Sequence, residues 1–310
     1  MPRKQRIEYP GAVYHVISRG NYRKELFLGE GTGLSFERAM FETVERCGWK
    51  LHAYVIMSNH YHLAVETPEP NLVDGMKWLQ STFATRFNRY RKECGHVFQG
   101  RYKSIIVGDD RPLLGLIDYI HLNPVRAGLC DVPGLKGYAL SSYSKYFKRS
   151  PLAGLCRGDF LSILDLPDSL AGMNRYKLHL EASEALEPKA RDALVQKYCR
   201  GWFIGNKEAK KALTKDLREK HPDVVWDGAS LRELNEAQWS ALLKKLMKLH
   251  NKSAREVKSD AKGASWKIEI ARQMRKETTA KNPWIAQHLN MGHPSRVSNL
   301  ISNKKGRHSI

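Results

Sequence analysis

Residues 58–65 read Ser-Asn-His-Tyr-His-Leu-Ala-Val, and both the fold and the chemistry of the chain can be argued from them. Side chains alternate between the two faces of a β-strand, so His60 and His62 share one face and Tyr61 takes the other, as a packing residue. Two neighbouring imidazoles can bind a metal ion. A His-x-His pattern by itself is more often coincidence, so the rest of the chain must support it.

The pair sits in a predicted β-hairpin made of residues 51–57 and 60–67, because Ser58-Asn59 suits a short turn. Two further strands are predicted at residues 11–19 and 98–107. Apolar spacings of three and four predict helices at residues 35–48, 71–91 and 112–123. The order β-α-β-β-α-β-α is typical of the ferredoxin-like, split-βαβ fold, an α+β class with an antiparallel sheet and helices on one face. An all-α C-terminal extension is expected to follow.

The helix at residues 112–123 carries a second group of interest. Tyr119 and Asn123 are four residues apart, so they share a helical face. The amide oxygen could be a third metal ligand and the phenol a nucleophile, although a surface pair at a helix end is the simpler interpretation of these two residues alone. Two imidazole nitrogens and one amide oxygen leave open positions on an octahedral ion, which suits Mg²⁺ or Mn²⁺ binding a phosphate.

Several segments together resemble a known family. They are residues 9–16, 19–21, 59–62, 98–102 and 119–128, within a region from about residue 7 to 146. They resemble the IS200-like Y1 transposases with a histidine–hydrophobic–histidine motif, and most closely the REP-associated tyrosine transposase branch. One departure is Ser58, where that branch commonly has proline.

The resemblance implies a mechanism and a substrate. His60, His62 and Asn123 would bind one Mg²⁺ or Mn²⁺ ion, and Tyr119 would attack a phosphate of single-stranded DNA. The product would be a covalent 5′-phosphotyrosine link and a free 3′ hydroxyl, formed at hairpins of repetitive extragenic palindromes. The extended chains of this branch imply a monomer. A domesticated, non-catalytic DNA-binding regulator is the alternative. A replication protein or relaxase is disfavoured, because no Gly-x-x-x-x-Gly-Lys-Ser/Thr motif is present.

The charge of the chain favours a polyanionic partner. Its 52 Lys and Arg against 32 Asp and Glu give a formal net charge of +20. The excess is +8 in residues 1–150, +2 in residues 151–225 and +10 in residues 226–310. The basic loop at residues 19–24, the start of the fourth strand and the end of the third helix supply candidate DNA contacts, although the loop could equally be an ordinary solvated turn. These candidates are Arg19, Asn21, Arg23, Arg101, Lys103 and Arg126.

Three regions are predicted from these patterns. Residues 1–150 would be the catalytic domain, and residues 151–225 a helical connector without a site, with a turn at residues 202–205. Residues 226–310 would be a basic helical region that ends in a helix-turn-helix-like pair at residues 283–301. Recognition helices present their first residues to base edges, so Ser295, Arg296 and Asn299 are the candidate contacts. A helical hairpin that serves only for packing is the alternative.

Localisation follows from what the sequence lacks. No apolar run approaches the length of a membrane span, and no signal-like core follows the basic N-terminus. The five scattered cysteines form no Cys-x-x-Cys pair, which disfavours a zinc ribbon or a disulfide framework. We therefore expect a cytoplasmic, nucleoid-associated protein with free thiols.

Overall fold

The computed structural model describes residues 6–28, 31–108, 110–148, 152–185, 188–220 and 232–302. The chain divides into two compact units, one of residues 8–211 and the other of residues 1–7 with 212–310. The boundary predicted at residue 150 does not coincide with this division, and the one predicted at residue 225 lies outside the described residues. In the described ranges, every helix is too short or too polar to span a bilayer.

The first unit contains a five-stranded sheet in the order β2-β3-β1-β4-β5. The strands are β1 (Ala12–Arg19), β2 (Lys50–Ile56), β3 (His60–Thr67), β4 (Lys103–Val107) and β5 (Phe203–Ile204). The first four strands are antiparallel and have the split-βαβ order, which confirms the predicted fold class. β5 pairs with β4 in parallel, so the predicted turn at residues 202–205 is wrong. A two-residue strand is too short to show the alternation from which strands are predicted.

The predicted helices are present with small shifts. They are α1 (Thr32–Cys47), α2 (Leu72–Arg91) and α3 (Asp110–His121). α3 stops two residues earlier than predicted, and the helical turn α4 (Asn123–Arg126) follows with Pro124 in its first turn. β4 starts later than predicted, because Gly100 turns the chain with φ of 69° and Phe98 forms an isolated bridge with Gly20 instead.

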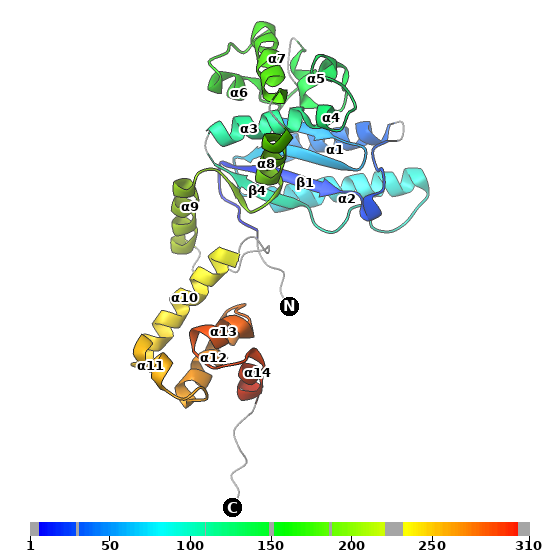
Figure 1. Ribbon diagram of the computed structural model, residues 1–310. Helices are drawn as coiled ribbons and strands as arrows, with labels where there is room; N and C mark the ends of the chain where they lie inside the picture. The colour runs from blue at the N-terminus through cyan, green and yellow to red at the C-terminus, as the bar shows by residue number, and fades with distance from the viewer. Residues whose placement is uncertain are drawn as a thin grey trace, which may run out of the picture. The chain divides into compact units, whose positions relative to one another are not determined.

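Helices cover both faces of the sheet, not one face as predicted. On one face, the ring of Tyr61 packs at 4.5 Å from that of Phe36 in α1 and close to α2, which confirms its packing role. On the other face, α3 contacts β2 and β3. Figure 1 shows α2 and α3 on opposite sides of the sheet. Residues on both faces of β2 and β3 are consequently buried, including His62.

The segments after α4 extend this cover. They are η2 (Pro133–Gly137), α5 (Ser142–Tyr146), α6 (Arg157–Ile163), α7 (Leu170–Glu184) and α8 (Pro188–Cys199). Buried polar contacts tie them to α3. Asp118 accepts hydrogen bonds from Tyr176 Oη at 2.8 Å and from His179 Nε2 at 2.7 Å, and His121 contacts Tyr176 Oη at 2.9 Å. The predicted connector is therefore part of the first unit as far as α8 and β5.

The second unit is helical, as predicted. Its helices are α10 (Arg232–Leu249), α11 (Ala254–Ser259), α12 (Ser265–Glu277), α13 (Asn282–His288) and α14 (Pro294–Ser302), and α9 (Lys207–Lys220) precedes them. Trp239, Ile270 and Met274 lie in its apolar core. Left-handed φ values at Asn290 (48°) and Gly292 (85°) make the turn between α13 and α14, the pair predicted to resemble a helix-turn-helix.

Candidate functional site

Three histidines from β1 and β3 lie side by side beneath α3. His60 and His62 share a face of β3, and their ring centres are 5.1 Å apart. His15 of β1 stacks on His62 with 5.0 Å between ring centres. His15 and His62 are almost completely buried, whereas His60 is partly exposed. The pair that the strand pattern singled out therefore has a third imidazole as its neighbour.

Hydrogen bonds fix the tautomers of these rings. His15 Nδ1 donates to the carbonyl oxygen of Tyr198 at 2.9 Å, because a carbonyl can only accept. In the neutral ring, His15 Nε2 then accepts, and it lies 2.8 Å from His62 Nδ1, which donates. His60 Nδ1 donates to Asn59 Oδ1 at 2.7 Å. In both His60 and His62 the remaining lone pair is consequently on Nε2, in the form that binds metals.

Burial keeps these rings neutral. It lowers the pKa of His15 to about 4 against the opposing effect of the Tyr198 carbonyl. Burial and the charge of Arg19 lower the pKa of His60 to about 4. Burial followed by the neighbouring histidines and Arg19 holds the pKa of His62 well below its ordinary value. At neutral pH the imidazoles therefore need lose no proton before they bind a metal ion.

Tyr119 of α3 lies over the histidines. Its ring centre is 5.5 Å from that of His62 and 6.0 Å from that of His15. The side chain is only 6% exposed, and its Oη lies 3.1 Å from Cys199 Sγ. Burial and then Cys199 raise the pKa of this phenol above its ordinary value, while Arg126 and Asn123 act in the opposite direction. Tyr119 therefore combines a position beside the histidines with a covered, protonated hydroxyl.

The end of α3 is closed by side chains. Asn123 Nδ2 donates to the backbone oxygen of Tyr119 at 2.8 Å, and Arg126 Nη1 donates to the same oxygen at 3.2 Å. The guanidinium carbon of Arg126 is 5.2 Å from the centre of the Tyr119 ring. Since Nδ2 of Asn123 is a donor, Oδ1 is the atom with which this side chain could bind a metal. Arg126 adds positive charge beside the phenol.

The donor set fits a divalent ion that keeps open positions. Within the described residues, no three His, Cys, Asp or Glu side chains converge in a way that could hold a metal ion. A third protein ligand would have to be neutral, as the Asn123 amide oxygen is. Two neutral imidazoles and a neutral oxygen leave the charge of the ion uncompensated, which favours an anionic phosphate as a further ligand.

The connector supplies groups to this site that the sequence did not predict. Tyr198 and Cys199, at the end of α8, contact His15 and Tyr119 respectively. Lys103 Nζ donates to the backbone oxygen of Cys199 at 2.6 Å, so the side chain of this predicted DNA contact also holds the end of α8. His15 could have been suspected from its place on the alternating strand at residues 11–19. Nothing in the sequence near Tyr198 and Cys199 indicates a site.

The remaining predicted DNA contacts of the first unit lie at the end of β1, in the loop that follows it, and in the segment just before β4. Arg19 is paired with His60 in the strand register, which places an exposed cation next to the histidine pair. The side chain of Asn21 makes hydrogen bonds within the protein. Its Nδ2 donates to the backbone oxygen of His96 at 3.2 Å, and its Oδ1 accepts from the Tyr22 backbone N–H. Arg23 and Arg101 are exposed on the surface.

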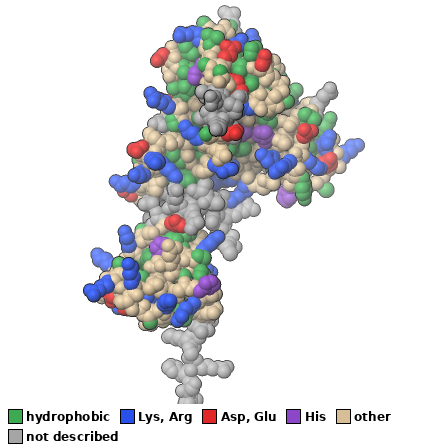
Figure 2. Space-filling view, in the orientation of Figure 1, with side chains coloured by type: hydrophobic (Ala, Val, Ile, Leu, Met, Phe, Trp, Pro, Cys, Tyr) green, Lys and Arg blue, Asp and Glu red, His purple; other side chains and the backbone are tan. Residues whose placement is uncertain are grey.

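The predicted contacts of the second unit are exposed on one helix. Ser295, Arg296 and Asn299 lie on α14, whose Val297 is buried in the core of the unit. Figure 2 shows Lys and Arg side chains over the visible face of each unit. Exposed polar residues on a helix are compatible with the nucleic-acid binding that the sequence predicts.

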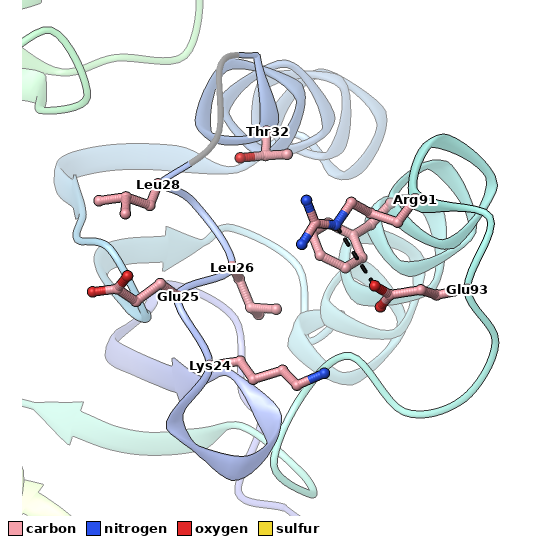
Figure 3. A pocket seen from close by; sticks show the side chains of 8 residues that line it. Lys24, Glu25, Leu26, Leu28, Thr32, Arg91 and Glu93 are labelled. Atoms are coloured by element: carbon pink, nitrogen blue, oxygen red, sulfur yellow. Dashed lines mark ion pairs between the residues drawn. The ribbon is translucent and has the colours of Figure 1, made fainter.

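A separate hollow of about 430 Å³ lies on the α1 and α2 side of the first unit. Lys24, Glu25 and Leu26 from the loop after β1 line one wall, and Arg91 and Glu93 at the end of α2 line the other, as Figure 3 shows. The Arg91 and Glu93 side chains pair at 3.8 Å, and the guanidinium carbon of Arg91 is 5.9 Å from the Phe87 ring centre. The walls of this hollow contain side chains of both charges, and neither His60 nor His62 lines it.

The family comparison matches part of the first unit. Residues 9–123 match the family model described as Transposase IS200 like. A Haemophilus influenzae protein whose assigned name is REP-associated tyrosine transposase is 29% identical over 125 residues, which are 36% of this chain and 69% of that protein. The matched region of the family model ends at Asn123, so Tyr198 and Cys199 lie outside it.

Two solved structures are also similar. A REP-associated tyrosine transposase bound to a REP hairpin is 16% identical, with a TM-score of 0.41, and the match covers 52% of this chain and 93% of that one. A transposase from Deinococcus radiodurans is 17% identical, with a TM-score of 0.29, and the match covers 42% of this chain and 99% of that one. Both TM-scores are low, so the fold assignment rests on the strand order of the chain itself. Residues 9–123 thus match the IS200-like Y1 transposase family, and the chain is distantly similar to a REP-associated tyrosine transposase.

Proposed function

We propose that the protein is a metal-dependent single-stranded DNA endonuclease and strand transferase. In this proposal Tyr119 is the nucleophile, and His60, His62 and Asn123 bind Mg²⁺ or Mn²⁺. The observation that carries the proposal is the distance of 5.5 Å between the ring centres of Tyr119 and His62. At this distance the proposed nucleophile would lie beside two imidazoles whose tautomers leave Nε2 for a metal ion.

The reaction is a transesterification. The Tyr119 oxygen forms a bond to phosphorus as the bond from phosphorus to the 3′ oxygen breaks. The phenol loses its proton, the 3′ oxygen gains one, and the 5′ phosphate stays on the tyrosine. The energy of the phosphodiester is retained in this link, so that a second 3′ hydroxyl can reverse the step. A bound divalent ion would polarise the phosphoryl group and offset the negative charge that develops on it.

The residues of the chain would orient the substrate around this step. Arg19 lies beside His60, and Arg126 lies beside Tyr119, so cations flank the nucleophile and the ligand pair. Guanidinium groups suit phosphate oxygens because they can donate two parallel hydrogen bonds. The surplus of 52 basic over 32 acidic residues supports a nucleic acid as the partner.

Hairpins of repetitive extragenic palindromes are the substrate that we propose, with the enzyme acting as a monomer in the cytoplasm. The support is the name of the Haemophilus influenzae relative together with the charge of this chain. Recognition would include the helix-turn-helix-like pair of the second unit, through Ser295, Arg296 and Asn299. Arg23 and Arg101 would contact the phosphate backbone.

The test is a cleavage assay on labelled hairpin DNA taken from repeats that flank the gene, with Mg²⁺ or Mn²⁺. We expect a denaturation-resistant protein–DNA adduct that disappears in Tyr119→Phe while DNA binding is retained. Tyr61→Phe is the matched control, because Tyr61 is a buried tyrosine on the opposite face of the sheet, and its adduct should persist. Failure of the unaltered protein to cut or link to any hairpin would refute the proposal.

One observation favours the alternative, a non-catalytic DNA-binding regulator. Tyr119 Oη is buried against Cys199, as expected of a tyrosine that only packs. The same assay separates the two functions. A regulator would bind the hairpin as tightly with EDTA as with Mn²⁺ and would give no adduct.

A further inference from the structure

We infer that His15 is a positioning residue for the metal centre and that the Tyr198 carbonyl holds it in place. The end of α8, which lies outside the family match, would therefore be part of the active site. The inference rests on the proposed metal-dependent function and adds to it a group that acts through His62.

The first step in the argument is the direction of the hydrogen bonds. The Tyr198 carbonyl can only accept, so His15 Nδ1 carries a proton. His15 Nε2 then accepts the proton of His62 Nδ1 over 2.8 Å. His62 is thereby held as the tautomer with an unprotonated Nε2. Without His15, either nitrogen of His62 could carry the proton, and part of the population would present N–H to a metal.

The second step is that the relay is rigid. His15 is completely buried, and its ring stacks on that of His62 at an interplanar angle of 23°. Tyr198 is fixed from several sides. Its ring lies 5.4 Å from the Tyr119 ring, and the next backbone carbonyl, that of Cys199, accepts a hydrogen bond from Lys103 Nζ. Groups that orient a metal ligand in this way usually change metal affinity by about 10- to 100-fold when they are removed.

The third step concerns the close packing of Tyr198, at the end of α8, against α3. Gly115 of α3 faces the Tyr198 hydroxyl, and a Cβ at this position would overlap Tyr198 Oη. Alanine is otherwise the better residue within a helix. Glycine at this position therefore leaves room for the Tyr198 ring against α3.

The experiment measures Mn²⁺ affinity through the EPR signal of the free ion, independently of DNA cleavage. His15→Leu removes both hydrogen bonds and should weaken Mn²⁺ binding about 10- to 100-fold. His15→Gln can donate to Tyr198 and accept from His62, so it should retain most of the affinity. His121→Leu is the matched control, because His121 is also fully buried and bonded, but to Tyr176 and Ser142. Its loss should lower stability without changing Mn²⁺ affinity.

A second pair of variants tests the role of α8 without altering a histidine. Gly115→Ala should weaken Mn²⁺ binding by moving Tyr198. The addition of Tyr198→Phe should restore binding, because it removes the overlapping hydroxyl and leaves the carbonyl in place.

Nitrogen-15 NMR of labelled histidine in the unaltered, metal-free protein reads the tautomer of His62 directly. This measurement does not depend on whether any variant folds. A proton on Nδ1 of His62 supports the inference, and a proton on Nε2 overturns it. Equal Mn²⁺ affinity in the unaltered protein and in folded His15→Leu would overturn the positioning role alone. If the unaltered protein did not bind Mn²⁺, the proposed metal centre would fall, and this inference with it.

Discussion

Tyr119 Oη lies 3.1 Å from Cys199 Sγ, although the two residues are 80 positions apart in the sequence. The nucleophile proposed for this protein is thus covered by a thiol from a helix outside the region that matches the transposase family. A phosphate must come within about 3–3.5 Å of the attacking oxygen before it can react. In the proposed reaction, the buried Oη would therefore have to be uncovered before a phosphate could reach it.

Cys199→Ala should accelerate adduct formation. The substitution removes the group that covers Oη and one of the causes that raise the pKa of Tyr119. We expect a several-fold faster reaction and a pH–rate profile moved to lower pH, measured in single-turnover assays with a hairpin substrate. Cys47→Ala, at the end of α1, is the control and should leave the rate unchanged. A rate for Cys199→Ala at or below that of the unaltered protein would show that the thiol does not restrain Tyr119.

A fragment that ends at residue 211 should keep the fold of the first unit, whereas one that ends at residue 150 should not. The shorter fragment lacks Phe160 and Tyr176, which are fully buried against α3 and α5, and it also lacks β5. Loss of one large core side chain costs about 3–5 kcal/mol, so the loss of two is comparable to the roughly 5–15 kcal/mol that stabilises a domain. Thermal unfolding followed by circular dichroism checks this. Cooperative melting of the shorter fragment would place the domain boundary at the position predicted from sequence.

Stability of the first unit should fall as the pH is lowered below about 6.5, in part because of His121. Burial lowers the pKa of His121 to about 3 in the folded protein, so the unfolded chain takes up a proton first. The contribution is present above the ordinary pKa and is lost on acidification, at roughly 1.4 kcal/mol for each pH unit below it. The free energy of unfolding, measured with urea between pH 7 and 4, should therefore depend less steeply on pH in His121→Gln than in the unaltered protein.

His179→Gln is the control for that measurement, because the contribution of His179 to stability changes with pH in the opposite direction. The bond to Asp118 raises the pKa of His179, so its contribution is present at low pH and is lost as the pH rises through the folded value. If both variants changed the pH dependence in the same direction, burial of His121 would not be the cause.

Arg296→Gln should weaken binding to hairpin DNA if α14 is a recognition helix. Loss of one phosphate contact lowers affinity for all sequences and reduces the salt slope by about one, whereas loss of a base contact costs about 1–3 kcal/mol on the preferred sequence alone. Fluorescence anisotropy at several salt concentrations distinguishes these outcomes. Lys276→Gln in α12 removes the same charge from another helix and is the matched control. An identical small effect in both variants would favour the alternative of a packing hairpin.

The parts of the site that follow from local periodicity could be predicted. Alternation within β3 puts His60 and His62 on one face, and the helical repeat puts Tyr119 and Asn123 together. The partner of His62 could not be predicted, because it depends on the register of β1 against β3, in which Ile17 is opposite His62 and His15 is its diagonal neighbour. One residue of slip would turn His15 to the other face.

The contribution of α8 to the site could not be predicted from the sequence for a related reason. His15 and Tyr198 are separated by 183 residues, and the group that matters in Tyr198 is a backbone carbonyl, which every residue has. The two residues of β5 were predicted as a turn because so short a strand has no pattern of its own. Their structure is set by β4, beside which they lie.

The pairing of β5 with β4 also bears on how copies of the protein can associate. An exposed edge strand offers unpaired N–H and C=O groups, to which another chain can add. Here β5 occupies the edge of β4 with only two residues, and isolated bridges from Leu155 and Ser141 reach the outer edge of β2. At these positions, backbone groups on the edges of β4 and β2 are therefore already paired. Two copies could not join their sheets there into one continuous sheet, and assembly would have to use side-chain surfaces instead.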